Sequence, residues 1–365
     1  MRLKEITDFL ETLAPLAYQE EYDNSGLLVG SYDEDVKSAL ISLDCTEAVL
    51  DEAIRKGCNL IISHHPIVFK GLKKFNGKNY VERVVMKAIK HNIALYAIHT
   101  NYDNVLDGVN KALADKLGLK NLKPLAPKSG ILKKLVTFCP SAQAEEVRQA
   151  LFTAGAGNIG NYSECSYNTE GLGTFKAGPG SAPFVGKQGE QHRESETRIE
   201  VIYSIASESK VLKALFKAHP YEEVAYDLYA ISNAHPQVGS GMLGDLENPM
   251  NELDFLKLVK KQLNCSLIRH TDLLGKEIQK VAICGGSGSF LLPQAIQAGA
   301  AIFITADYKY HEFFDAEGRI VIADVGHYES EQFTQTLLFE RISEKFPNFA
   351  LHLTEQNTNP VNYLI

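Results

Sequence analysis

Residues 58–66 read Cys-Asn-Leu-Ile-Ile-Ser-His-His-Pro, a short apolar stretch that runs directly into two histidines and a proline. A run of this length, rich in isoleucine and bounded by polar residues, is typical of a buried strand. The segment before it, 46–56, is predicted to be a helix with Thr46 as its N-cap and Gly57 at its end. Another short apolar strand is predicted at 38–44. Strands separated by helices predict right-handed crossovers and a mostly parallel sheet.

The same alternation continues downstream and returns in the last third of the chain. The predicted strands cover 93–98, 279–284, 301–305 and 319–324, and the predicted helices cover 80–91, 107–117, 290–297 and 329–345. Polar residues cluster just after the strand ends in both thirds. Because ligands of open α/β sheets bind at the carboxyl ends of strands, both thirds could contribute to one crevice.

The middle of the chain has a different pattern. Prolines at 124 and 127 mark one boundary, and the segment from His235-Pro236 to Pro249 marks another. Between them we expect strands over 134–139, 198–206 and 223–231, helices over 142–155 and 208–218, and a long polar loop that includes 171–189. This order predicts a small α+β domain of the ferredoxin-like kind. We therefore expect a discontinuous core, residues 1–124 and 236–365, and an inserted domain, residues 125–235.

Composition narrows the class of protein. The chain has 365 residues and a formal net charge of -8, from 45 acidic against 37 basic residues. Such an acidic balance disfavours a protein that coats nucleic acid or an anionic membrane. None of the six cysteines forms a Cys-x-x-Cys pair, which disfavours a thiolate zinc site. The amphipathic start and the lack of a spanning apolar run predict a cytoplasmic protein without membrane association.

Three histidines and two carboxylates form a candidate metal site. His64 and His65 are adjacent, and neighbouring side chains of an extended chain point apart, so two metals could take one each. Asp103 follows the next strand, and His327 and Glu331 are spaced to share one helical face. A mixed nitrogen and oxygen set suits zinc, iron or manganese. Each residue also fits a structural role, as a turn or a helix cap, and that alternative stays open.

Five further residues lie near strand ends or in adjoining loops and are candidates for the same pocket: His99, Lys70, Ser287, Asp307 and His311. His99 could support a ligand, act as an acid or base, or simply end a core strand with a hydrogen bond. Lys70 begins a lysine-rich stretch that could steer an anion or be a solvated surface. Ser287 lies in a glycine-serine turn that could cradle a phosphate or only connect strand to helix. Asp307 and His311 could line the crevice or cap a helix.

Several motifs, taken together and in order, resemble the GTP cyclohydrolase 1 type 2-like family, also called the Nif-three-like proteins. They are YDNSGLLVG at 22–30, LDCT at 43–46, SHHP at 63–66, HTNYD at 99–103, GGSG at 285–288 and DVGHYESE at 324–331. This resemblance covers about residues 1–122 and 243–365. Tyr102 departs from the leucine common at that place, which is not a ligand position.

The middle segment, about residues 124–233, resembles the insert of longer bacterial members. That insert is similar in fold to ferredoxin-like domains of the signalling and copper-tolerance type. The stretches Gly171-Leu172-Gly173-Thr174-Phe175 and His219-Pro220-Tyr221-Glu222-Glu223 carry this part of the resemblance.

The resemblance implies an α/β fold: two similar halves with mixed or parallel sheets flanked by helices, and an inserted α+β ferredoxin-like domain. It implies two divalent metal ions per chain, zinc first, with iron or manganese as alternatives. The family's ligands map onto His64, His65, Asp103, His327 and Glu331. It further implies a toroidal homohexamer and a hydrolase in which metal-activated water attacks the guanine ring of GTP.

Other functions fit the same residues. A small-molecule phosphoester is an alternative hydrolase substrate for a dinuclear centre. A non-enzymatic role, as a metal-binding scaffold, metal chaperone or regulatory hexamer, is the alternative from a different class. The predicted insert favours that role, because such domains sense small molecules in other proteins. Binding of nucleic acid inside a ring is disfavoured by the net charge.

Overall fold

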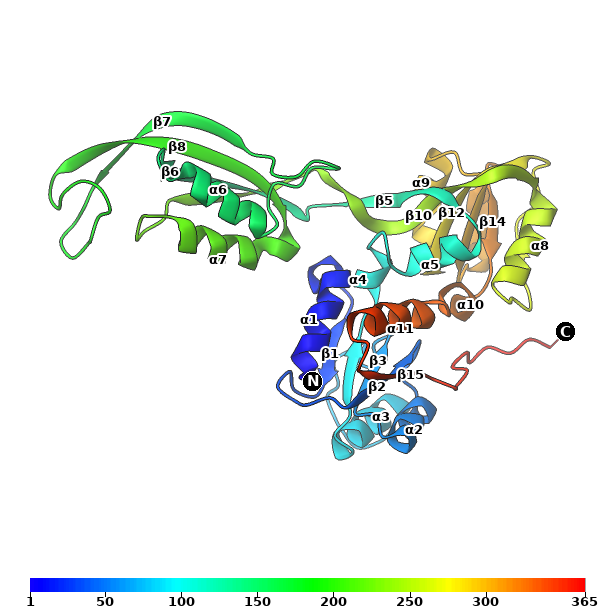
Figure 1. Ribbon diagram of the computed structural model, residues 1–365. Coiled ribbons are helices and arrows are strands. Elements are labelled where there is room, and N and C mark those ends of the chain that lie inside the picture. Colours follow the sequence, from blue (N-terminus) through cyan, green and yellow to red (C-terminus); the bar gives the residue numbers. More distant parts are fainter. Residues whose placement is uncertain (365) are drawn as a thin grey trace. The chain divides into compact units, whose positions relative to one another are not determined.

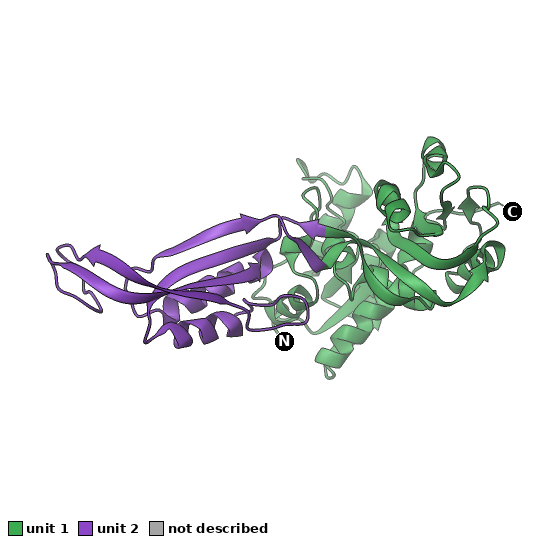
Figure 2. Cartoon of the chain, turned by 90° about the horizontal axis from the view of Figure 1, so that it is seen from above, with its two compact units in different colours: residues 1–127, 237–365 green, residues 128–236 purple. Residues whose placement is uncertain are grey.

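The computed structural model describes residues 1–364 and divides the chain into two compact units (Figure 2). The core unit consists of residues 1–127 and 237–365, and the inserted unit of residues 128–236. Three β-sheets flanked by helices make up a mixed α/β fold, two sheets in the core unit and one in the inserted unit. The expectation of an α/β fold with mixed sheets is confirmed at this level.

The first sheet of the core unit has the strand order β1-β4-β3-β2-β15. Its strands are β1 (Gly26–Val29), β2 (Ser38–Ser42), β3 (Leu60–Ser63), β4 (Ala94–Ala97) and β15 (Ala350–Leu353). Strands β4, β3, β2 and β15 are parallel, and β1 pairs antiparallel with β4. Strands β2, β3 and β4 are buried on both faces, which explains their largely apolar sequence.

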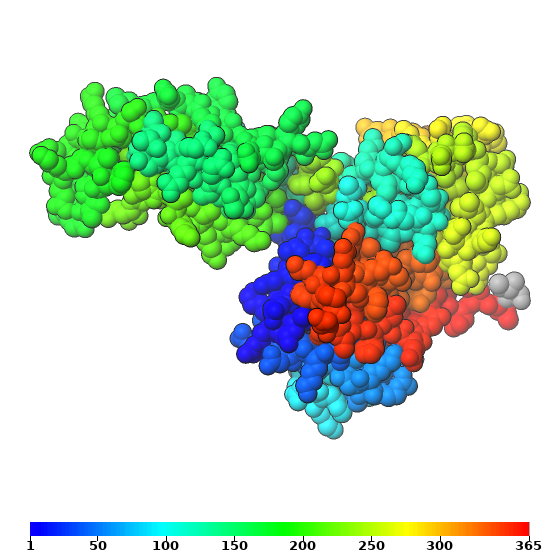
Figure 3. Space-filling view, viewed as in Figure 1, coloured from blue at the N-terminus to red at the C-terminus, as the bar shows by residue number. Residues whose placement is uncertain are grey.

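Alternate residues of these strands pack into two hydrophobic cores, one on each face of the sheet. Ile41 and Ile62 pack with helices α1 (Leu3–Leu13) and α11 (Thr334–Lys345). Leu40 and Ile61 pack with α2 (Glu47–Lys56) and α3 (Tyr80–Lys90) on the other side. The chain's beginning and its last helix lie together, with the Phe9 and Phe346 rings 5.5 Å apart (Figures 1 and 3). The last third of the sequence therefore supplies the edge strand β15 and the covering helix α11 of the first sheet.

The second sheet of the core unit has the order β11-β14-β13-β12-β10-β5. Its strands are β5 (Lys120–Ser129), β10 (Ala234–Asn251), β11 (Arg269–His270), β12 (Glu277–Ser287), β13 (Ile302–Ala306) and β14 (Val321–Asp324). Strands β12, β13 and β14 are parallel, whereas β10 and β11 pair antiparallel with β12 and β14. Helices α5 (Val109–Lys116) and α8 (Glu252–Gln262) pack on one face, and α9 (Leu292–Gln297) with η4 (Tyr310–Ala316) on the other.

The inserted unit is a four-stranded antiparallel sheet in the order β7-β8-β6-β9 with two helices packed on it. Its elements are β6 (Leu132–Pro140), α6 (Ala144–Thr153), β7 (Tyr167–Lys176), β8 (Gln191–Ser204), α7 (Glu208–Ala218) and β9 (Tyr226–Ile231). Leu135, Ile199 and Val201 of the sheet pack against Val147 and Leu215 of the helices.

Some local predictions are confirmed and others are wrong. The Thr46 side chain accepts from the Val49 N–H, and Gly57 ends α2 in the left-handed conformation, as expected. The loop predicted around 171–189 is wrong at its start, because β7 occupies Tyr167–Lys176. That strand is mostly exposed and so lacks apolar alternation. The single helix expected over 329–345 is instead two, α10 (His327–Glu331) and α11.

Over residues 1–364, none of the helices combines the length and the apolar character that crossing a bilayer requires.

Candidate metal centre

The five residues of the predicted metal set come together within the core unit. His64 and His65 directly follow β3, and Asp103 ends α4 (Thr100–Asp103), which follows β4. His327 and Glu331 lie at the two ends of the short helix α10, just after β14. The carboxyl ends of strands from both sheets thus supply the set, as the strand-end pattern predicted.

The Glu331 carboxylate stands between two groups of side chains. Its Oε2 atom lies 3.0 Å from Nε2 of His65 and 3.0 Å from Nε2 of His327. It also lies 3.8 Å from Nε2 of His64, which is 3.6 Å from Oδ1 of Asp103. The donor atoms of His65, His327 and Glu331 form one compact group, and those of His64, Asp103 and Glu331 form another. The two groups share the Glu331 carboxylate.

Buried polar atoms without hydrogen bonds point to a cation at this place. Nε2 of His64, Oδ1 of Asp103 and Oε2 of Glu331 are buried, and none of them makes a hydrogen bond among the described residues. His64 is fully buried and Glu331 is 3% exposed. An unpaired buried polar atom costs about 1–3 kcal/mol, more if charged, so three converging in one place need a common partner. Imidazole nitrogen and carboxylate oxygen suit a divalent transition metal, and the residues therefore fit that group.

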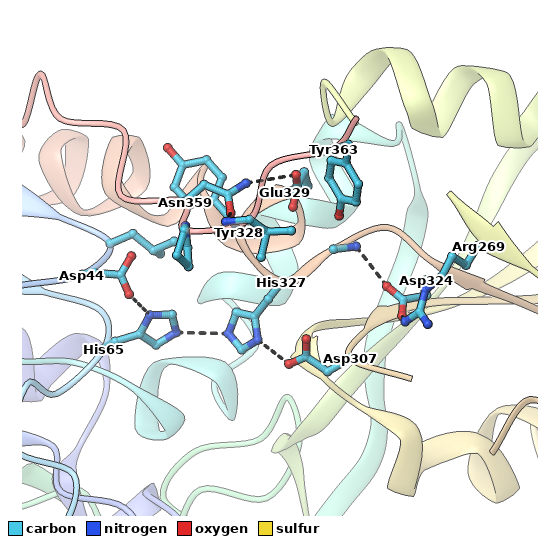
Figure 4. A pocket seen from close by; sticks show the side chains of 14 residues that line it. Asp44, His65, Arg269, Asp307, Asp324, His327, Tyr328, Glu329, Asn359 and Tyr363 are labelled. Carbon is cyan, nitrogen blue, oxygen red and sulfur yellow. Dashed lines mark hydrogen bonds and ion pairs between the residues drawn. The ribbon is translucent and has the colours of Figure 1, made fainter. Parts of the chain in front are cut away.

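Each histidine of the set is held by an acceptor at its other nitrogen. Nδ1 of His65 lies 2.7 Å from Asp44 Oδ1, and Nδ1 of His327 lies 2.7 Å from Asp307 Oδ2 (Figure 4). Nδ1 of His64 lies 2.8 Å from the Ile98 carbonyl oxygen. Because a carbonyl or ionised carboxylate only accepts, each Nδ1 is the donor. The Nε2 lone pairs are then available to bind a metal, the usual arrangement of metal-binding histidines.

Three residues of the site have pKa values well away from their ordinary ranges. Burial opposes ionisation of Glu331, but His327, His64 and His65 outweigh it and hold the pKa of Glu331 well below its ordinary range. Burial and the nearby Glu331 carboxylate raise the pKa of Asp103 to about 7. Burial alone would lower the pKa of His65, but the hydrogen bond to Asp44 and the nearby Glu331 carboxylate raise it to about 9. Two buried carboxylates that repel each other are stabilised by a cation between them.

Replacing Asp307 by asparagine is expected to weaken metal binding by about 10- to 100-fold. The Asp307 carboxylate orients the His327 ring and raises its basicity. The substitution leaves the ligand set intact but replaces this carboxylate by a weaker, neutral acceptor. The dissociation constant for zinc, measured by competition with a chelator, gives the effect. Asp315→Asn is the matched control, because Asp315 is exposed in η4. Equal affinity of the two variants would contradict the orienting role of Asp307.

His99 lies against the two adjacent histidines and is held by a buried carboxylate. Its ring centroid is 5.2 Å from that of His64 and 5.3 Å from that of His65. Nδ1 of His99 lies 2.7 Å from the buried Asp23 carboxylate, which also accepts from the Thr100 N–H. Asp23 belongs to the motif at 22–30, but the motif does not show that Asp23 holds His99.

Three other pocket candidates do not line the cavity beside the predicted ligands. These residues, Lys70, Ser287 and His311, are exposed. The glycine turn before Ser287 does not offer free N–H groups, because Gly285 donates to Asn110 Oδ1 and Gly286 to Ser330 Oγ. The idea of a phosphate cradle there is therefore wrong at these two amides.

A cavity of about 540 Å³ adjoins the predicted ligands His65 and His327 (Figure 4). Asp44 and Asp307 line it as well, together with Arg269, which is paired with Asp324. Further lining residues come from α10 and from the end of the chain, including Tyr328, Glu329, Asn359 and Tyr363. Asn359 donates to Glu329 at 3.2 Å. Sequence reasoning missed Arg269 and the C-terminal segment, which carry no motif of their own.

Comparisons with known proteins give a consistent result. The family model described as Duf34/NIF3 (NGG1p interacting factor 3) matches residues 1–360. A protein of Halalkalibacterium halodurans named "GTP cyclohydrolase 1 type 2 homolog" is 42% identical, over 88% of this chain and 87% of that protein. A Bacillus subtilis protein of the same name is 37% identical, over 99% of this chain and 98% of that protein.

A solved structure agrees in fold over the whole length. The crystal structure of a Bacillus cereus protein related to NIF3 superposes with a TM-score of 0.84 at 39% identity. The match covers 100% of this chain and 99% of that one. The resemblance drawn from the motifs is thereby confirmed, and the chain belongs to the Duf34/NIF3 family.

Proposed function

We propose that the chain holds two divalent metal ions, bound by His64, His65, Asp103, His327 and Glu331. The observation that carries this proposal is the position of Glu331 Oε2, which lies within 4 Å of His64, His65 and His327 and makes no hydrogen bond to any residue that the structure describes. A carboxylate in that position can bridge two ions. Zinc is the first candidate, and iron or manganese would suit the same donors.

We further propose that the centre serves a metal-dependent hydrolase. Divalent ions bound there would supply Lewis acidity and lower the pKa of a bound water. The chain's own contribution is to hold the histidines in one tautomer through Asp44 and Asp307, and to offer the adjoining cavity to a small substrate. The name of the relatives suggests GTP as that substrate.

The lining of the cavity beside the centre favours a second substrate class. Among the described residues that line it, Arg269 is the one lysine or arginine, and Asp324 already pairs with it. The lysine stretch that begins at Lys70 does not contribute, and the Gly285 and Gly286 amides are engaged elsewhere. A triphosphate would thus find few cationic groups besides the metals. A phosphoester with less negative charge is the second candidate.

Turnover by the metal-reconstituted chain separates these proposals. We expect release of product from GTP or from one member of a phosphoester panel, with no activity after chelation of the metal. Formate release would identify opening of the guanine ring, and phosphate release would identify a phosphoesterase. A chain that holds two metal equivalents and turns over none of these substrates would contradict the hydrolase proposal. It would favour the non-enzymatic role of a metal-binding or regulatory protein.

We also propose that the chain assembles as a toroidal homohexamer. Exposed aromatic side chains of the core unit, including Phe290, Tyr310 and Phe314, support an association surface. Analytical ultracentrifugation is expected to give a single species of six chains. A monomer at micromolar concentration would contradict the assembly.

The inserted unit is proposed to be a ferredoxin-like domain. Its element order, β6-α6-β7-β8-α7-β9, is the β-α-β-β-α-β order of that fold and supports the assignment. Its helices share one apolar core with the sheet and need no residue from outside the unit to form it. From the sequence we expect this domain to span residues 125–235, close to the inserted unit of residues 128–236.

Deletion of residues 128–236 is expected to leave a folded core that still binds metal. A short linker suffices, because Gly239 packs directly against Ala126 and Pro127, so the two cut ends lie close together. Cooperative thermal unfolding and two metal equivalents per shortened chain are the expected results. Aggregation, or a core that binds no metal, would show that the division of the chain is wrong.

A further inference from the structure

A second cavity, of about 380 Å³, lies wholly within the inserted unit (purple in Figure 2). Its walls come from 174–184 and 221–225, together with Glu196 of β8. These segments bring together the ends of the two stretches that marked the insert in the sequence, Gly171–Phe175 and His219–Glu223. Neither stretch contributes to the candidate metal centre.

Three aromatic rings stand around one side of this cavity. The Tyr221 ring is 6.0 Å from that of Phe175 and 6.4 Å from that of Phe184, measured between centroids. Both phenylalanines are tilted against it, by 62° and 54°. Phe184 is 53% exposed, so its ring is not used to fill the core of the unit. The faces of such rings carry partial negative charge and attract cations.

The central tyrosine is fixed from both ends. Its backbone N–H donates to Nδ1 of His219 at 3.1 Å, and Nε2 of His219 lies 2.9 Å from the Phe138 carbonyl oxygen. Its hydroxyl donates to Oε1 of Glu196 at 2.8 Å. A Cβ atom at Gly173 would overlap with the Glu196 carboxylate, so glycine at that position of β7 makes room for it. The arrangement is therefore formed before any ligand arrives.

The charged groups of the lining are mostly acidic. The described residues of the lining include three glutamates, Glu196, Glu222 and Glu223, and one cationic residue, Lys176. Glu222 also accepts from the Ala182 N–H at 2.8 Å and so holds the loop that carries Phe184. An anionic ligand would be repelled by this set. Within residues 1–364, the groups of three or more His, Cys, Asp or Glu side chains close enough to share a metal ion all lie in the core unit, so a bare transition-metal ion would find few ligands here.

We propose that this cavity binds a small organic cation, an ammonium that carries alkyl groups. Aromatic faces stabilise the diffuse charge and the methyl or methylene groups, and the carboxylates stabilise the net charge. Aromatic rings together with carboxylates distinguish such a ligand both from a metal ion and from a neutral molecule of the same shape. The inserted unit thus has a ligand class of its own, independent of the metal-dependent reaction proposed for the core unit.

Isothermal titration of the full-length chain tests this proposal. The probes are choline, tetramethylammonium and spermidine, with 3,3-dimethyl-1-butanol as the neutral molecule that matches choline in shape. We expect saturable binding of at least one cation below about 10 mM and no binding of the neutral probe. Phe184→Ala is expected to weaken the binding about tenfold. Glu222→Gln keeps an oxygen for the Ala182 N–H but removes the charge, and should weaken it as well.

Phe216→Ala is the matched control, because Phe216 is 49% exposed in the same unit but does not line the cavity. It is expected to bind the cation as the natural chain does. Thermal unfolding of every variant shows whether a lost signal reflects a misfolded unit, and Glu222→Gln provides a second variant if Phe184→Ala is unstable. Failure of all three cations to bind would overturn the proposal. Equal binding of choline and its neutral counterpart, or equal effects of Phe184→Ala and Phe216→Ala, would overturn it too.

Discussion

A Glu331→Gln chain is expected to lose both metal ions at concentrations that saturate the natural chain. Glu331 Oε2 lies 3.0 Å from Nε2 of His65 and of His327, and 3.8 Å from Nε2 of His64, so its charge serves both donor groups. Glutamine has nearly the same shape, but its amide is neutral and a far weaker ligand. Substitution of a residue that only supports a metal ligand lowers metal affinity by up to about 100-fold. Because Glu331 is itself a proposed ligand, we expect a larger loss of affinity here. Elemental analysis after dialysis measures it.

Glu329→Gln is the matched control for this substitution. Glu329 lies in the same helix, α10, is also buried, and accepts from Asn359 instead of facing the histidines. We expect this variant to retain both ions. If Glu331→Gln lost only one ion, Glu331 would belong to one metal position and not to two. Retention of two ions by Glu331→Gln would remove the basis of the dinuclear proposal.

The sequence indicated which side chains meet, because their chemistry is tied to strand ends. His64 and His65 follow a strand that only a buried, parallel position explains, and Asp103 follows its neighbour in the sheet. His327 and Glu331 showed helical spacing. These local patterns were sufficient to place five residues in one crevice.

What the sequence did not indicate depends on contacts between distant segments. Asp307 was a pocket candidate and Asp44 lies in the motif at 43–46, but the histidines that they orient are 20 and 21 residues away, so no local pattern shows that role. Arg269 lies on a two-residue strand, too short for any periodicity. Strand β7 was missed because both of its faces are largely exposed, so its sequence shows no apolar alternation. It pairs with β8 through backbone hydrogen bonds and a contact between the Phe175 and His192 rings.

A Gly286→Ala chain is expected to fold less stably and to bind metal at least about tenfold more weakly. Gly286 has a φ of 63°, a conformation that costs an alanine about 1–2 kcal/mol. A Cβ atom there would also overlap with Oε1 of Glu331 and lie 3.1 Å from Cε1 of His327. The Glu331 side chain is only 3% exposed, so we expect relief of the overlap to displace the donor shared by both groups. Thermal unfolding and chelator competition measure the two effects.

Gly118→Ala separates backbone strain from overlap, because Gly118 has a similar φ of 70° but no atom within 4 Å of the added Cβ. We expect it to lose about 1–2 kcal/mol of stability and to keep the natural metal affinity. The difference in stability and metal affinity between the two variants then measures the effect of displacing Glu331 and His327 from their positions beside residue 286. The glycine at 286 would thus be required for close approach to the metal centre and not for phosphate binding. If both variants bound metal equally well, the overlap with Glu331 would be relieved without cost, and this explanation of the glycine would be wrong.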